Sequence, residues 1–176
     1  IDYANSKMRS DFMDIYLGAK CTFCISTWLG FDSVPFVFRK PIAFIFLPFG
    51  HLITENEKDL LITKHHLNKT TGKSLTISEI FSANIALSFS SEMFKKNNVE
   101  LEENTPEEIK DFVIEMEERL SGKWKETQED LILQNSFWQI FEKNLKKLNL
   151  QSPIYNLKNK SKFGAAFLRE NQNWIK

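Results

Sequence analysis

The sequence predicts an α/β protein in which a parallel β-sheet is covered by helices. Two nearly continuous apolar runs, Cys21–Ser26 and Ile42–Leu47, have the composition of strands buried on both faces. Each run is preceded by a segment with helical signals, so strands and helices alternate at the spacing of βαβ units. This spacing predicts that the two strands are parallel neighbours joined by a right-handed crossover.

Two helices are expected to connect the strands of the first fifty residues. Ser10 is a good N-cap for a helix through Leu17, and Gly18 suits its C-terminal end. The apolar residues of this helix follow helical spacing: Phe12, Ile15 and Tyr16. The second helix is expected from Asp32 to Arg39, because Pro41 pushes Lys40 out of the α region. Ahead of both, Ile1–Tyr3 reads as the end of a strand.

The rest of the chain contains weaker strand signals and stronger helix signals. Leu60–Thr63 reads as a short strand or an extended loop, and Asn68–Lys73 as a turn. Helix starts are marked by Thr76 with Glu79, and by Thr105 with Pro106 and two acids. The expected later helices are one that ends at Gly122, one over Thr127–Leu148, and one over Lys162–Trp174.

These elements suggest a division into two parts. Residues 1–96 form a sheet-containing part, and residues 97–176 a helical C-terminal region packed on it. Because Ile1–Tyr3 reads as the end of a strand, we expect further βα elements before it. An open sheet edge or an apolar patch is therefore expected near Ile1–Tyr3.

Composition excludes several classes of function. Of 176 residues, 23 are Lys or Arg and 23 are Asp or Glu, which argues against a nucleic-acid binder that depends on excess positive charge. No apolar run approaches the ~18 residues of a membrane helix. The segment Glu142–Lys162 is rich in lysine, which fits either peripheral contact with an anionic membrane or ordinary solvated helix faces.

The most informative polar segment lies between the first strand and the second helix. Ligands of open parallel sheets bind at the carboxyl ends of the strands, where helix N-termini present free N–H groups to phosphates. Hydroxyls and a glycine of this segment could complete such a site. The candidate phosphate-binding residues are Ser26, Thr27, Gly30, Asp32 and Ser33. The alternative is that these residues only cap and turn the chain.

Other chemically active residues carry weaker signals. His51 and Glu55 follow the second strand at the same sheet edge, so they are expected on the rim of the site. Cys21 and Cys24 lie in an apolar strand, which predicts two buried structural thiols rather than a redox pair. His65 and His66 are adjacent and should point apart, so no metal site is expected.

These segments together resemble the nucleotide-sugar half of GT-B glycosyltransferases. More narrowly, they resemble a family of bacterial glycosyltransferases associated with surface-polysaccharide gene clusters. The segments that carry the resemblance are Ser10–Leu17, Ala19–Lys20, Ile25–Thr27, Gly30–Pro35 and Lys40–Ile42, followed by Leu75–Thr76, Glu79–Ile80, Asn104–Ile109, Phe163–Leu168, Asn171 and Trp174. The resemblance covers nearly the whole chain but only the C-terminal part of such an enzyme.

The resemblance implies a Rossmann-like domain that binds a nucleotide-sugar donor without a metal or other cofactor. The enzyme would transfer the sugar to a glycan or lipid-linked acceptor, in the cytoplasm and at the inner face of the membrane. It also implies an N-terminal domain of the same polypeptide that supplies acceptor contacts. Trp28 and Leu29 depart from the small residues expected there, so Trp28 either stacks on the nucleobase or narrows the loop. The alternative function is a non-catalytic α/β binding or assembly module.

Overall fold

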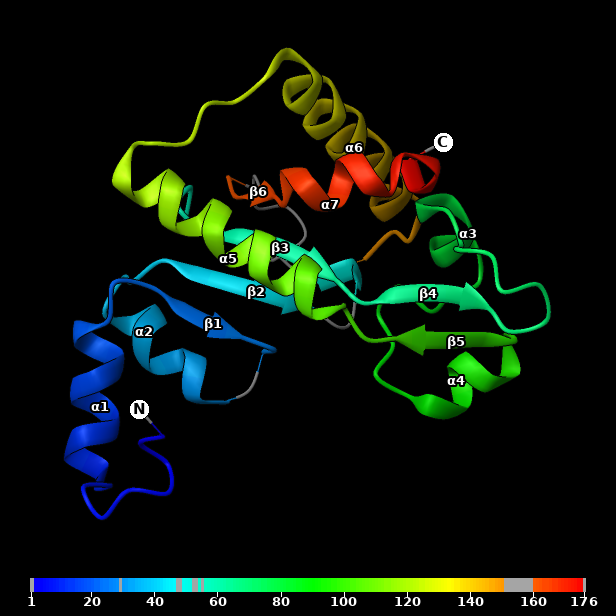
Figure 1. Ribbon diagram of the computed structural model, residues 1–176. Helices are drawn as coiled ribbons and strands as arrows, with labels where there is room; N and C mark the ends of the chain where they lie inside the picture. Colours follow the sequence, from blue (N-terminus) through cyan, green and yellow to red (C-terminus); the bar gives the residue numbers. More distant parts are fainter. Residues whose placement is uncertain are drawn as a thin grey trace.

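A four-stranded parallel sheet forms the centre of the molecule. The computed structural model describes residues 2–28, 30–46, 49–51, 54, 56–150 and 160–175. The strands are β1 (Cys24–Ser26), β2 (Ile42–Phe46), β3 (Leu60–Thr63) and β6 (Lys162–Phe163), in the order β1-β2-β3-β6 (Figure 1). All three pairings are parallel, which confirms the predicted neighbours β1 and β2. The fold is mixed α/β and consistent with a Rossmann-like sheet.

Helices and a second, smaller sheet surround these strands. Strands β4 (His65–Asn68) and β5 (Val99–Glu102) form an antiparallel pair at one end of the molecule (Figure 1). The α-helices are α1 (Asp11–Lys20), α2 (Ser33–Val37), α3 (Ile77–Ser82), α4 (Ser91–Lys96), α5 (Pro106–Ser121), α6 (Gln128–Lys147) and α7 (Ala165–Glu170). The 3-10 helices are η1 (Gly30–Asp32), η2 (Phe49–His51) and η4 (Gln172–Ile175). None of the helices in the described ranges is long and apolar enough to span a membrane.

The expectation that both N-terminal strands are buried on two faces is right for one of them and wrong for the other. The described side chains of β2 are buried, and all four residues of β3 are buried. Strand β1 lies at the edge of the sheet, and the Ile25 side chain is 49% exposed. Apolar composition cannot distinguish an edge strand from a central one, because that depends on a neighbour from elsewhere in the chain.

Helix α1 forms where it is expected but packs through a different face. Ser10 accepts a hydrogen bond from the Met13 N–H and caps the helix as predicted. Gly18 does not end the helix: it lies within it, buried where a Cβ would come within 2.7 Å of Val34 Cγ1. Because α1 contacts α2 through this glycine, the predicted apolar stripe of Phe12, Ile15 and Tyr16 is exposed.

The chain before α1 does not form the expected strand end. Asp2 and Tyr3 lie in a turn segment, where the Tyr3 hydroxyl donates to the Ser10 carbonyl; Ile1 lies outside the described residues. Among the described residues, the two edges of the sheet are β1 and β6, and neither Asp2 nor Tyr3 belongs to them. Helix α2 is also shorter than expected and ends at Val37, and Arg39 is in the left-handed region at φ 53°.

The predicted starts of three later helices are confirmed. Capping boxes open α3 at Thr76, α5 at Thr105 and α6 at Thr127. Gly122 ends α5 with φ 73°, a conformation that glycine adopts without strain. Leu60–Thr63 is a strand rather than a loop.

The C-terminal segment contributes to the sheet as well as to the helices around it. Lys162 and Phe163 were predicted to be helical but form β6, which pairs with β3 across about a hundred positions of sequence. Helix α7 and η4 follow, and α5 and α6 pack against α7 (Figure 1). The centre of the core is a cluster of aromatic side chains: Phe49, Phe137, Phe141, Phe163 and Trp174.

Candidate functional site

The carboxyl edge of the parallel sheet is stepped. Ser26, the last residue of β1, is level with Phe44 of β2, and β2 continues for two more residues. Strand β3 likewise extends two residues beyond Leu61, which is level with the end of β6 at Phe163. The loop that follows β1 therefore lies beside the projecting end of β2, on the side of the sheet edge where ligands of parallel sheets bind.

The five predicted phosphate-binding residues all lie in this loop, and three of them hold it in shape. The Ser26 hydroxyl donates to Asp32 Oδ2 over 2.8 Å and accepts a hydrogen bond from the Trp28 N–H over 3.1 Å. The Ser33 hydroxyl donates to the Gly30 carbonyl over 2.6 Å. Asp32 is buried at 9% exposure. The hydroxyl protons of Ser26 and Ser33 are therefore already used in hydrogen bonds within the loop.

Thr27 and Gly30 lie on the outside of the loop. Both residues are exposed, and an added Cβ at Gly30 would meet nothing within 4 Å. Gly30 has no positive φ, so the fold itself does not require glycine at this position. The open space lets a ligand approach the Gly30 backbone directly.

The helical segment that follows this loop is short. The 3-10 turn η1 leads into α2, and Asp32 makes no side-chain capping bond at the junction. Because η1 runs directly into α2, the N–H groups of Ser33 and Val34 lie inside a continuous helical segment, and the free start of this segment is at Gly30 and Phe31. Because α2 has five residues, its dipole is small, so the hydrogen bonds of individual N–H groups matter more than the macrodipole.

Trp28 has an unusual backbone conformation in the same loop. Its φ is 58°, and its side chain is 40% exposed. The left-handed region is unfavourable for a bulky side chain, so the surrounding structure must hold it there. This strain places a large aromatic side chain at the carboxyl end of β1.

The two predicted rim residues cannot be placed fully. His51 belongs to η2, which follows β2, but its side chain lies outside the described residues. Glu55 also lies outside the described residues.

The two cysteines are half-buried, not fully buried as predicted. The reason is the edge position of β1: among the described strands, only β2 pairs with it. Burial raises the pKa of the Cys24 thiol, and the nearby Cys21 and Asp32 raise it further. The Cys24 thiol is therefore protonated at neutral pH and is a poor nucleophile. Within the described ranges no three His, Cys, Asp or Glu residues are placed to hold a metal ion.

A second group of polar side chains lies at the carboxyl end of β3. His65 Nε2 donates to Glu108 Oε1 over 2.8 Å, and the His65 ring stacks on Phe167. Lys64 pairs with Glu103. The sequence does not reveal the His65–Glu108 contact because 43 positions separate the two residues. The only local signal is the capping box at Thr105, to which Glu108 also belongs.

His66 points away from His65, as expected, and is buried between Phe49 and Phe94. Its Nδ1 bonds the Lys64 carbonyl over 3.0 Å, so Nδ1 carries the proton. Burial lowers the pKa of His66 to about 4, which keeps the ring neutral at pH 7. In the described part of the chain, His66 Nε2 and Asn104 Oδ1 have no hydrogen-bond partner.

Two small cavities adjoin this second group. One is lined by Glu108, Glu115 and Gly164, and the other by His65, His66 and Trp174, among other residues. Each has a volume of about 10 Å³, which is room for roughly one water molecule. Neither cavity has room for a sugar nucleotide.

Comparisons with known proteins do not assign the chain to a family. No family model matches the sequence. No curated protein and no solved structure is significantly similar to it.

Proposed function

We propose that this chain is the donor-binding part of a metal-independent glycosyltransferase of the GT-B type. The observation that most directly supports this proposal is the position of the Ser26–Ser33 loop at the carboxyl end of β1. This loop brings all five candidate residues to the ligand-binding edge of a parallel sheet, next to the first turn of α2. The reaction would transfer a sugar from a nucleotide-sugar to a glycan or lipid-linked acceptor of a cell-surface polysaccharide.

In this proposal the loop residues have two roles. Ser26 and Asp32 hold the loop, and Thr27 together with the N–H groups near Gly30 contacts the diphosphate. Trp28 stacks on the nucleobase, which would explain why a bulky residue is kept at φ 58°. Hydrogen bonds from N–H and hydroxyl groups would then offset the charge of the leaving diphosphate in place of a metal.

One observation favours the alternative of a non-catalytic α/β module. The hydroxyl protons of Ser26 and Ser33 are consumed within the loop, as in an ordinary turn. A module of this kind would keep the sheet and the loop but bind no nucleotide.

Calorimetric titration with uridine and guanosine diphosphates separates the two functions. Thr27→Val removes an exposed hydroxyl from the loop and should weaken binding about tenfold to a hundredfold, since a hydrogen bond to a charged group contributes about 1.5–3 kcal/mol. Thr22→Val is the matched control. Thr22 is also exposed, but it precedes β1 and therefore lies at the amino end of the strand, away from the proposed site. Absence of binding by the unmodified chain at millimolar nucleotide would favour the module. Binding with equal affinities for both variants would instead show that Thr27 does not contact the nucleotide.

A further inference from the structure

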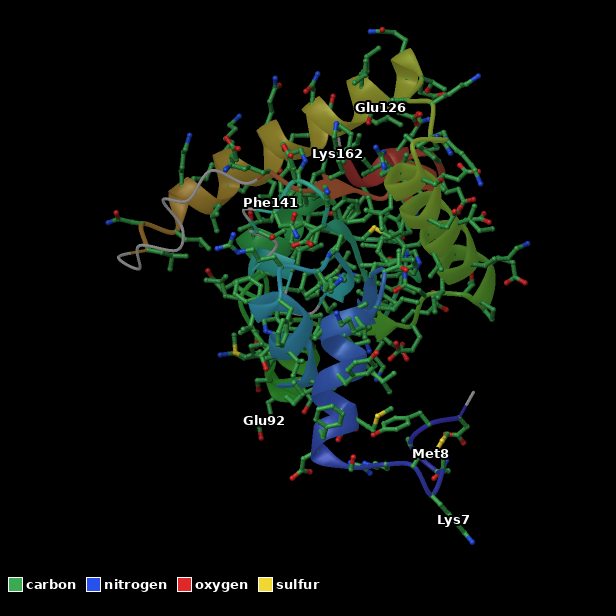
Figure 2. The ribbon with its side chains drawn as sticks, turned by 90° about the vertical axis from the view of Figure 1, so that its left-hand side faces the viewer. Lys7, Met8, Glu92, Glu126, Phe141 and Lys162 are labelled. Carbon is green, nitrogen blue, oxygen red and sulfur yellow. The ribbon has the colours of Figure 1, made fainter. Side chains whose placement is uncertain are left out.

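Exposed apolar side chains gather on the three elements at the β1 end of the molecule. We define the apolar face by Phe12 and Tyr16 of α1, Ile25 of β1, Phe36 and Val37 of α2, and Phe38 next to α2. Their exposed fractions range from 45% for Tyr16 to 73% for Phe12. Figure 2 looks onto this end of the molecule, with α1 in front. Helix α1 contacts α2, and both helices are drawn next to β1 in Figure 1.

The area of the apolar face is at the upper end of the range for a monomer. At about 200 Å² for an aromatic side chain and somewhat less for Ile and Val, the six residues expose about 600 Å². The largest apolar patch of a typical monomer is about 300–600 Å², and a stable interface buries about 800 Å² on each partner. The face therefore supplies most of the area that a stable interface needs, before any backbone contact is counted.

The edge of β1 adds directional hydrogen-bonding groups to this face. The Cys24 N–H donates to the Pro41 carbonyl of the chain leading into β2, so Cys24 faces β2. Because successive residues of a strand alternate, the N–H and carbonyl of Ile25 point away from β2, toward the open edge. Strand β1 has no charged residue and no proline, which are the features that usually protect an edge from pairing.

We propose that this face is a homodimer interface in which β1 pairs with β1 of a second copy. An antiparallel pair centred on Ile25 is self-complementary, because the two Ile25 residues exchange both backbone hydrogen bonds around a two-fold axis. The two four-stranded sheets then form one continuous sheet, and the apolar helices of both copies cover the junction. The net charge of zero removes the overall repulsion that would oppose association of identical chains.

Light scattering after size-exclusion chromatography tests the proposal on the chain as it is, at about 5–200 µM. We expect twice the mass of one chain. Phe36→Ser should raise the dimer dissociation constant at least tenfold, because it removes exposed apolar area without touching the core. Phe89→Ser is the matched control: Phe89 is 69% exposed but lies outside the apolar face, so this variant should remain dimeric.

Charge complementation tests the strand pairing itself. Ile25→Lys and Ile25→Glu should each be monomeric, since like charges would stand directly opposite one another across the two-fold axis. A mixture of the two variants should restore a dimer, which a misfolded variant could not do. A monomeric unmodified chain would overturn the proposal and assign the apolar face to another polypeptide segment. A dimer that survives both Ile25 substitutions, or a series of larger assemblies, would also overturn it.

Discussion

Gly164, at the junction of β6 and α7, offers the sharpest test of the packing. An added Cβ would lie 2.7 Å from Ile62 Cγ2, whereas carbon atoms pack favourably at about 3.5–4.0 Å. Ile62 is in the central strand β3 and is fully buried, so it has little freedom to move away. Overpacking of this kind typically costs about 1–3 kcal/mol.

The backbone at Gly164 is compatible with alanine, so strain of the chain does not enter the comparison. Its φ of −53° lies in an allowed region. Replacing glycine by alanine at such a position gains about 0.4–1 kcal/mol through the unfolded state. For Gly164→Ala we therefore expect a net loss of about 1–2 kcal/mol in the free energy of unfolding.

Urea unfolding followed by circular dichroism measures this loss. Gly30→Ala is the matched control, because its Cβ meets nothing within 4 Å and should leave stability unchanged or slightly higher. In an Ile62→Ala background the clash is absent, so Gly164→Ala should cost measurably less there. If Gly164→Ala is as stable as the unmodified chain, the close approach of α7 to β3 is wrong.

Two further predictions concern buried and capping side chains. The pKa of His66 is lowered to about 4 in the folded state, against about 6.5 in the unfolded state. The neutral ring therefore contributes fully to the free energy of unfolding above pH 6.5, and this contribution is lost as the pH falls from 6.5 toward 4. His66→Phe should therefore flatten the fall in unfolding free energy between pH 7 and 4.5, by up to about 3 kcal/mol; equal pH slopes for both proteins would contradict the burial of a neutral ring. Thr105→Ala should lower the free energy of unfolding by about 1 kcal/mol through loss of the α5 cap, and Thr71→Ala, at an exposed turn, should change urea unfolding less. A Thr105→Ala protein with unchanged stability would show that the cap contributes nothing.

Helix positions were predictable wherever the residues that start or end the helix lie within one helical turn of each other. The capping boxes at Thr76 and Thr105 need a partner three residues away, and the turn at Gly122 needs one glycine. The helix after Ser10 formed for the same reason, but its extent did not follow from its sequence. Gly18 reads as a helix end, and only the contact with Val34 and Pro35 explains a glycine inside the helix.

In the candidate site, too, the position of contiguous residues was predictable from the sequence, whereas contacts between distant residues were not. The Ser26–Ser33 loop is contiguous, so its position after a strand was predictable, and its five candidate residues lie between the end of β1 and the start of α2. Whether each hydroxyl faces a ligand or the loop depends on how the loop closes, which the residue types do not specify. The His65–Glu108 contact joins β4 to α5, and no local pattern marks such a pair.

The sequence by itself determined the α/β class, the parallel pairing of β1 with β2, and most helix starts, because these depend on residues a few positions apart. The tertiary structure decided which strand lies at the edge, why the apolar stripe of α1 is exposed, and that Lys162–Phe163 completes the sheet as β6. The burial of an apolar residue depends on neighbours brought from distant parts of the chain. A run such as Cys24–Ser26 therefore reads as buried in sequence and becomes an open edge in the fold.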